Sequence, residues 1–258
     1  MHRTNIRISA SRPPRRAFFA LLGIGGLLVL WQTGFVLGGP FVVPAPGETF
    51  LLVIDLIGKG DVWQPAMITA RDVVIGYAAG CLAGLLLGLA AGAAAEIAAA
   101  LEPVATIILG IPPIAWVVLA LLWFGPQGMA AAFTVAIGIA PIIFAAAIAG
   151  LRGANPDLDE LAAAYHAPPW QSFVEIHLPQ MAVSLVPALA TALGLAWKMA
   201  LMAEVLGGGQ GIGGRLADAR SHLDMAETMA WIVIALGLLL ATDRLLARAA
   251  ASMPVVSR

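Results

Sequence analysis

Few residues of this chain have side chains that could serve in catalysis or metal binding, and they lie far apart in the sequence. Its two lysines, Lys59 and Lys198, are not followed by the Ser or Thr that completes a phosphate-binding loop. His166, His177 and His222 have no cysteine or pair of carboxylates at the spacing of a metal site, and no nucleophile is arranged for hydrolysis. The sequence therefore predicts no catalytic residue, no metal site and no cofactor bound by this chain, which does not itself hydrolyse ATP.

A glycine-rich segment at 207–214 contains the literal pattern G-x-G-x-x-G from Gly209 to Gly214. In a dinucleotide site this pattern follows a strand and opens a helix within a βαβ unit. No strand precedes it here, so we do not expect a dinucleotide site. We expect a flexible loop instead.

The composition is that of a membrane protein. Of the 258 residues, 60% are hydrophobic and 11% are charged, whereas soluble domains carry about 25% charged residues. Most of the surface therefore cannot face water. The 14 Lys and Arg residues nearly balance the 15 Asp and Glu residues, which argues against binding to nucleic acid. Cys81 is the only cysteine, so intrachain disulfides are excluded.

Several uncharged apolar runs are long enough to cross a bilayer, which takes about 20 helical residues. The run at 103–150 is too long for one crossing, and the turn-forming residues 125–128 divide it into two helices of about twenty residues each. We therefore predict an all-α membrane protein with six transmembrane helices. They lie within 17–38, 73–95, 103–124, 129–150, 181–206 and 228–246.

Basic residues predict which side of the membrane each segment occupies. Five arginines and no acidic residue precede residue 17, and Arg244, Arg248 and Arg258 lie near the other end. By the positive-inside rule both ends lie in the cytoplasm, which agrees with an even number of spans. We expect a cytoplasmic basic N-terminus at 1–16 and a single transmembrane domain at 17–258. A cytoplasmic loop would then lie at 151–180, with 39–70 and 207–227 outside.

Two features of the spans suggest specific roles. Gly76, Gly80, Gly84 and Gly88 recur every four residues on one face, which lets another helix approach closely. Lys198 and Glu204 lie in the fifth span, where burying an ionisable side chain costs at least about 2.5 to 3.5 kcal/mol. They point about 120° apart on a helix, so we do not expect them to pair. Each is a candidate functional residue, and the alternatives are a structural role for Lys198 and contact with water for Glu204.

The loop at 151–180 is longer than a connection requires and has the pattern of two short helices. Asn155 is a suitable N-cap, and Pro156 and acidic residues follow it in the first turn. Apolar residues then recur at helical spacing in two groups separated by Pro168-Pro169. We expect the second helix to close at Leu178-Pro179. The apolar positions are Leu158, Leu161, Ala162 and Tyr165 in the first helix, and Trp170, Phe173, Val174 and His177 in the second.

These two amphipathic helices have two possible partners, which are the lipid headgroups and the groove of another protein. Lipid binding favours Lys and Arg on the polar face, but the loop has one Arg and four acidic residues. The charge therefore favours a protein partner.

The loop also carries a motif. Glu160-Leu161-Ala162, then His166, then Ile176-His177-Leu178-Pro179 resembles the EAA loop of ABC importer permeases. The pattern of that loop is Glu-Ala-Ala, three residues, Gly, nine residues and Ile-x-Leu-Pro. The spacing matches throughout, although Leu161 replaces an Ala and His166 replaces the Gly. A Gly there permits a left-handed turn, which His tolerates less well.

The resemblance extends over nearly the whole chain and is strongest to the nitrate/sulfonate/taurine group of these permeases. It rests on Val43-Pro44-Ala45-Pro46, Ala70-Arg71, Gly76-Tyr77, Ile111-Pro112-Pro113-Ile114-Ala115-Trp116, Trp123-Phe124-Gly125, Ala196-Trp197 and Ala203-Glu204. It implies the type I ABC importer permease fold in a bacterial inner membrane. The partners it implies are a dimer of ATPase subunits that bind ATP, an extracytoplasmic solute-binding protein, which the glycine-rich loop would contact, a second permease copy and membrane lipid.

The resemblance also implies roles for individual residues. The ATPase-coupling residues would be Glu160, Leu161, Ala162, Tyr165, His166, Ile176, Leu178 and Pro179. Trp197, Lys198 and Glu204 are the candidates for the translocation pathway of a sulfonate, taurine, nitrate or similar solute. A membrane-embedded enzyme and an ion-coupled secondary transporter remain the alternatives. The first needs a cluster of acids, His or metal ligands at a membrane face, and the second needs charges in several spans.

Overall fold

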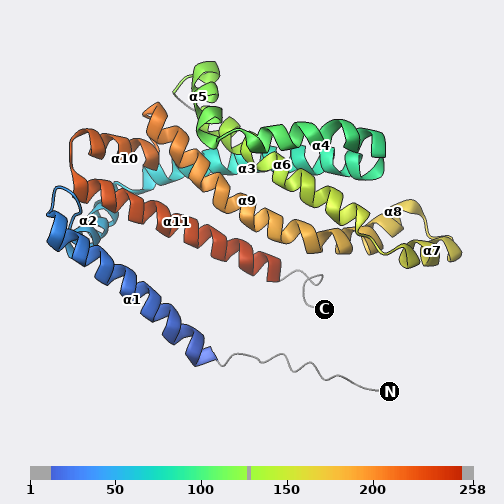
Figure 1. The fold of residues 1–258 in the computed structure, drawn as a ribbon, viewed down its shortest axis with the longest axis horizontal. Helices are drawn as coiled ribbons and strands as arrows, with labels where there is room; N and C mark the ends of the chain where they lie inside the picture. Colours follow the sequence, from blue (N-terminus) through green and yellow to red (C-terminus); the bar gives the residue numbers. More distant parts are fainter. Residues whose placement is uncertain (1–12, 127–128, 252–258) are drawn as a thin grey trace.

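The computed structural model of the chain describes residues 13–126 and 129–251, and all secondary structure in these two ranges is helical (Figure 1). Arg3, Arg7 and Arg12 of the predicted basic N-terminus, and Arg258, lie outside the described residues. The elements are α1 (Pro13–Gly38), α2 (Pro46–Lys59), α3 (Trp63–Ala93), α4 (Ala95–Gly110), α5 (Pro113–Phe124), α6 (Met129–Arg152), α7 (Pro156–Ala164), α8 (Pro169–Ser172), the π-helix η1 (Phe173–His177), α9 (Leu178–Gly207), α10 (Ile212–Ser221) and α11 (Met225–Ala251).

Within residues 13–126 and 129–251, five helical segments are long and apolar enough to cross a membrane. Each coincides with one of the predicted spans, and most extend beyond it. They are Phe18–Gly38, Trp63–Ala93, Met129–Arg152, Trp170–Gly207 and Met225–Leu245.

The third predicted span is not the single helix that we expected. It is formed by α4 and α5, which together are apolar enough to cross a membrane but meet at a bend of 93°. The bend falls at Ile111 and Pro112, whose backbones are extended with ψ angles of 125° and 137°. A residue before proline avoids the helical conformation, and proline has no N–H to donate to the preceding turn. The apolar run concealed this bend because hydropathy does not register it.

The centre of the bundle is built by α3, α6 and α9, since α6 packs against both of the others. The predicted glycine face of α3 is confirmed, because it lies directly on the backbone of α6. A Cβ atom on Gly80 would lie 2.6 Å from Ile139 Cγ1 and 2.7 Å from Ala136 O, closer than real Cβ atoms come. Gly76, Gly84 and Gly88 meet α6 in the same way, one turn apart. The four glycines therefore set the distance between the two helices.

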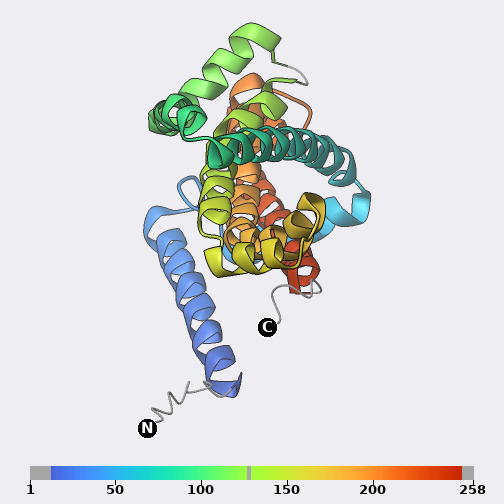
Figure 2. The same ribbon diagram turned by 90° about the vertical axis from the view of Figure 1, so that its right-hand side faces the viewer.

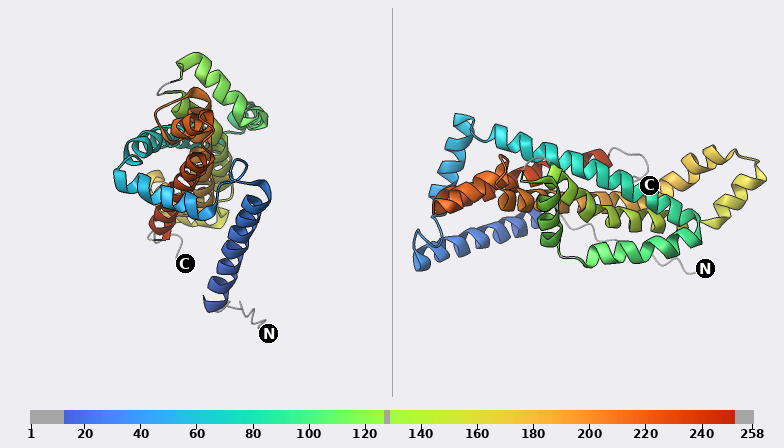
Figure 3. Two further views of the ribbon diagram at one scale, coloured as in Figure 1. Left: turned by 90° about the vertical axis from the view of Figure 1, so that its left-hand side faces the viewer. Right: turned by 90° about the horizontal axis from the view of Figure 1, so that it is seen from above.

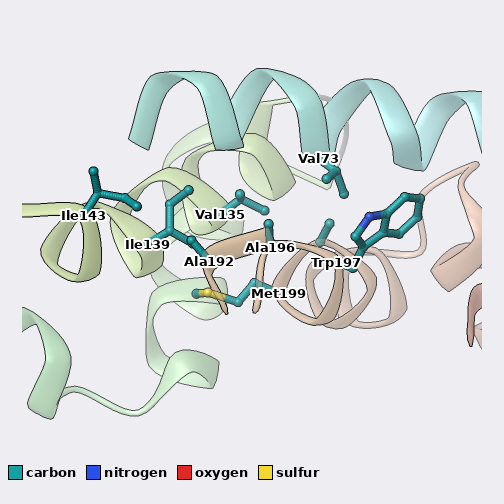
Figure 4. Packing of buried hydrophobic residues seen from close by; sticks show 9 residues of the cluster. Val73, Val135, Ile139, Ile143, Ala192, Ala196, Trp197 and Met199 are labelled. Atoms are coloured by element: carbon teal, nitrogen blue, oxygen red, sulfur yellow. The ribbon is translucent and has the colours of Figure 1, made fainter. Parts of the chain in front are cut away.

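The main apolar core lies among the same three helices (Figure 4). Val73 comes from α3, whereas Val135, Ile139 and Ile143 come from α6. Small side chains dominate the contribution of α9, which allows the backbones to come close. The α9 residues are Ala192, Ala196, Trp197, Met199 and Ala200.

The two ends of the bundle carry different structures (Figure 1 and Figure 3). The short helices α7 and α8 lie at one end of the long axis, and α2 and α10 lie at the other. The start of α1 and the end of α11 both point toward the end with α7 and α8. We call this the hairpin end, and the one with α2 and α10 the opposite end.

Helix α1 lies apart from the rest of the bundle (Figure 2). Its main contact is with α2, and Trp31 Nε1–H donates a hydrogen bond of 2.9 Å to Pro44 O in the connection between them. None of the apolar stretch of α1 is buried inside the chain. Its side chains therefore face lipid or another protein.

Replacing two glycines by alanine should change the stability of the protein in opposite directions, because only one of them lies on the glycine face. We expect Gly80→Ala to lower the thermal midpoint of the purified protein, because the added methyl forces α3 and α6 apart at a cost of about 1 to 3 kcal/mol. Gly58 in α2 has nothing near its Cβ position, so Gly58→Ala should raise stability by up to about 1 kcal/mol through helix propensity alone. A midpoint for Gly80→Ala at or above that of the native protein would contradict this packing.

Candidate functional site

The segment from Asn155 to Gln180, which we call the hairpin, begins with the helix that the sequence predicted. Asn155 is the N-cap of α7, and its side-chain oxygen accepts a hydrogen bond of 3.0 Å from the N–H of Asp157. The Asn155 N–H in turn donates to Gln180 Oε1 at 2.7 Å. The two ends of the hairpin are therefore tied to each other where it leaves α6 and enters α9.

The tip of the hairpin turns at His166, the position that holds Gly in the EAA pattern. His166 has a φ of 53°, and the only other described non-glycine residue with positive φ is Leu223. The His166 N–H donates to Ala163 O at 3.0 Å, and the Ala167 N–H donates to Ala162 O at 2.9 Å. These two bonds form the Schellman motif, which ends a helix with a left-handed residue. His166 thus adopts the left-handed turn that a glycine would favour.

The second half of the hairpin does not close where we expected. Instead of ending at Leu178-Pro179, α8 continues through η1 into α9. The Leu178 N–H bonds to Phe173 O, five residues back, and this wider turn gives the ring of Pro179 room in an unbroken helix. The hairpin is therefore continuous with the long helix α9, which reaches the opposite end of the bundle.

One apolar face of the hairpin is uncovered. Tyr165 is 79% exposed and Trp170 is 70% exposed, and Leu161 is also exposed. A hollow of about 210 Å³ lies between α7 and the second half of the hairpin. Its walls include four of the predicted coupling residues, namely Leu161, Ala162, Tyr165 and Ile176.

The other predicted coupling residues lie around this face. Glu160 is exposed on α7 and His166 is exposed at the turn. Leu178 and Pro179 form the first turn of α9.

A second candidate site lies toward the opposite end of the bundle, where Glu204 is buried with 5% of its surface exposed. Glu204 Oε2 accepts hydrogen bonds from Thr69 Oγ1 at 2.9 Å and from the Gly213 N–H at 2.8 Å. The Ile212 N–H donates to Thr69 Oγ1 at 2.9 Å. The carboxylate thus meets the N-terminus of α10, where backbone N–H groups and the helix dipole favour a negative charge. Our alternative that Glu204 simply reaches water is wrong.

The glycine-rich segment is likewise not the flexible loop that we expected. Its second half begins α10, and Ile212, Gly213 and Gly214 are buried. A Cβ atom on Gly211 would clash with the Glu204 carboxylate, and one on Gly213 would lie 2.6 Å from Glu204 Cβ. These glycines serve close packing around a buried acid, which the spacing of the pattern alone does not reveal.

A cavity of about 320 Å³ adjoins Glu204, and we call it the Glu204 cavity. Residues of α3, α5, α6 and α9 line it together with the glycine-rich segment. Asp72 on α3, which is 8% exposed, and the exposed Arg71 are also on its wall. Sequence reasoning missed Thr69 and Asp72, although an acid at the start of an apolar run is a signal that was available.

The structure does not bring the three predicted pathway residues into one site. Trp197 is buried in the core between α3 and α9. The neighbouring Lys198 is exposed, and both residues border a hollow of about 200 Å³ between α9, α10 and α11. Glu204 belongs to the Glu204 cavity instead.

The described part of the chain has five or six segments that are long and apolar enough to cross a membrane and an uncovered apolar hairpin at one end, which is the architecture of a multi-pass membrane protein. Residues 80–251 match the model of the binding-protein-dependent transport system inner membrane component, which is more than half of the chain. The chain therefore belongs to this family, the multi-pass inner-membrane permeases of ABC importers, and is a transport subunit rather than an enzyme.

Individual relatives agree with this assignment. The chain is 29% identical to the aliphatic sulfonates transport permease protein SsuC of Escherichia coli, over 81% of this chain and 80% of the relative. It is 31% identical to the nitrate import permease protein NrtB of Leptolyngbya laminosa, over 88% and 81%. It is 28% identical to the bicarbonate transport system permease protein CmpB of Synechococcus elongatus, over 88% and 86%.

Solved structures share the fold. A chain of an amino acid ABC transporter superposes with a TM-score of 0.63 at 16% identity, covering 78% of this chain and 98% of that one. A chain of the MetNI methionine ABC transporter gives 0.53 at 22% identity, covering 73% and 94%. The predicted ABC importer permease fold is confirmed.

The left-handed turn at His166 gives a second test. His166→Val should destabilise the tip of the hairpin by about 1 kcal/mol or more, because a β-branched side chain fits this backbone region poorly. His166→Gly should leave the turn at least as stable as in the native protein. Hydrogen exchange at the Ala167 amide measures the difference. Equal protection in the two variants would show that the turn is not left-handed.

Proposed function

We propose that this permease, paired with a second copy of itself, forms the pathway of an importer for a small sulfonate, nitrate or similar solute. The solute would arrive on an extracytoplasmic binding protein, and a dimer of ATPase subunits would supply the energy. The names of SsuC and NrtB support this solute class. The uncovered hairpin is the observation that carries the proposal.

The hairpin has the properties of a joint between the permease and an ATPase subunit. Its apolar face is uncovered, and its ends are held together by the bond from the Asn155 N–H to Gln180. Residues 155–180 contain four acids and no Lys or Arg, and an anionic lipid surface attracts basic segments. A groove in a protein partner therefore fits this surface better than lipid does. Because α6 enters the hairpin and α9 leaves it, movement of the partner would reach both core helices.

Lys198 supports a second copy beside α9. It lies nine residues before the end of α9 at Gly207, about 13 Å along the helix. Its side chain is exposed on the single chain, but a cation at this depth facing lipid costs at least about 2.5 to 3.5 kcal/mol. A polar pathway shared with the second copy would remove this cost, and Lys198 would attract an anionic solute there. Helix α1, which lies apart from its own bundle, would pack on the same partner.

The orientation that we propose places the hairpin in the cytoplasm with both chain termini. It follows from the positive-inside rule and from the direction of α1 and α11 toward the hairpin end. The cavity at Glu204 would then open toward the extracytoplasmic side, from which solute arrives.

Substitutions in the hairpin test the coupling role. Leu161→Asp and Glu160→Lys should each leave the permease in the membrane but lower solute-stimulated ATPase activity of the assembled complex at least about tenfold. A decrease of this factor is expected from the loss of one central interface contact, which contributes about 2 kcal/mol or more to binding.

Leu223→Asp is the matched control, because Leu223 is equally apolar, 73% exposed and at the opposite end of the molecule. It should retain stimulation in an assay with the ATPase subunits present. Native stimulation in both hairpin variants would overturn the assignment of the hairpin as the joint.

A further inference from the structure

Helix α2 is too short to cross the membrane and lies across the bundle. Its 14 residues extend over about 21 Å, whereas the hydrocarbon core is about 30 Å thick. Figure 3 shows that α2 runs across the long axis of the bundle, whereas α3 and α11 run along it. The hairpin, in contrast, continues this axis beyond the bundle (Figure 1). Because the spans follow the long axis, α2 runs parallel to the membrane surface.

Two of the three faces of α2 have clear surroundings. Val53 and Leu56 pack against buried side chains of α3, α10 and α11, which fixes the helix on the bundle. The second face is a charged stripe, formed by the exposed residues Glu48, Asp55 and Lys59. At 100° per residue these three lie within about 40° of one another, and Lys59 Nζ donates a hydrogen bond of 2.6 Å to Asp55 Oδ2. The charged stripe is therefore the face of α2 that belongs in water.

The third face of α2 is apolar and uncovered, and we call it the apolar face. Leu51 is 70% exposed and Ile54 is 66% exposed, and Phe50 and Ile57 are exposed beside them. Ile54, at the centre of this face, lies at least about 100° around the helix from every residue of the charged stripe. A protein that approaches from the water therefore meets the charges first, whereas the apolar face is turned away from water.

Aromatic side chains mark the depth of both ends of α2. Near its start, the rings of Phe50 and of Trp31 in α1 have centroids 6.0 Å apart. Soon after its end, Trp63 begins α3 and is 60% exposed. Tryptophan favours the boundary between hydrocarbon and headgroups. Both tryptophans therefore indicate that α2 lies at this boundary.

We propose that α2 is a membrane-surface helix, with its apolar face in the acyl chains of one leaflet and its charged stripe in water. A helix of this kind is held by the burial of apolar area. The stripe carries two acids and one Lys, so anionic headgroups do not attract it. Because the chain already tethers α2 between α1 and α3, apolar burial is sufficient. Helix α2 thereby fixes the depth of the ends of α1 and α11, which it contacts.

Spin labels on single cysteines measure the surroundings of each face. In a Cys81→Ala chain, Leu51→Cys and Ile54→Cys place the label on the apolar face, and Glu48→Cys and Asp55→Cys are the matched controls on the charged stripe. All four positions are exposed, so the labels leave the fold intact. The purified full-length permease is reconstituted in nanodiscs of phosphatidylcholine, which has no net charge. Collisions of each label are then measured with oxygen, which concentrates in hydrocarbon, and with a water-soluble nickel chelate.

The ratio of oxygen to nickel collisions decides between the possible surroundings. We expect a high ratio at Leu51 and Ile54 and a low ratio at Glu48 and Asp55, because only the first pair lies among acyl chains. Equal ratios on the two faces would show that α2 lies in water or is wholly immersed, and would overturn the proposal. Labels at Leu51 and Ile54 that neither reagent reaches would also overturn it, because a second copy of the chain would then cover the apolar face.

Discussion

The contact of α3 with the backbone of α6 is the constraint on which the rest of the structure depends. Four glycines on one face of α3 bring the two helices closer than any side chain would allow, and α9 packs against both of them. Without a hydrophobic driving force between helices in lipid, such close packing is what holds a membrane bundle together. Because the packing is close, α3, α6 and α9 move together, and a displacement of one helix displaces the other two.

The two candidate sites lie on the same helices for this reason. The hairpin is the covalent link between α6 and α9, and its second half runs without a break into α9. Glu204 lies near the far end of α9 and holds the start of α10 and Thr69 of α3 through one carboxylate oxygen. A shift of the hairpin that moves α9 along its axis would therefore change the contacts of Glu204. In the proposed importer, this is a physical route from the ATPase subunits to the solute side.

The features that the sequence predicted well are those that depend on local chemistry. The glycine face follows from its period of four, and the start of α7 follows from Asn155 and Pro156. The left-handed turn at His166 does not follow from the sequence in the same way, because His tolerates that backbone region less well than the Gly of the motif does. Hydropathy located five of the six spans, because the length and composition of an apolar run are also local properties.

The features that the sequence did not predict depend on contacts between distant segments. Nothing near Pro179 indicates that a wider turn would carry the helix past it. The role of the glycine-rich segment depends on Glu204 and on Thr69, which is 135 residues away from Glu204 in the chain. The 93° bend between α4 and α5 was readable from Pro112-Pro113, but the uniform hydropathy of the run concealed it.

The side of the membrane on which the hairpin lies can be measured directly. Cys81 is the only cysteine, so a Cys81→Ala chain with Tyr165→Cys carries one thiol on the hairpin, and Phe41→Cys carries one at the opposite end, where Phe41 is 86% exposed. A membrane-impermeant maleimide on intact spheroplasts should label the Phe41→Cys chain, and should label the Tyr165→Cys chain only after permeabilisation. Labelling of the Tyr165→Cys chain in intact spheroplasts would place the hairpin outside, away from nucleotide, and would contradict its role as the joint with an ATPase.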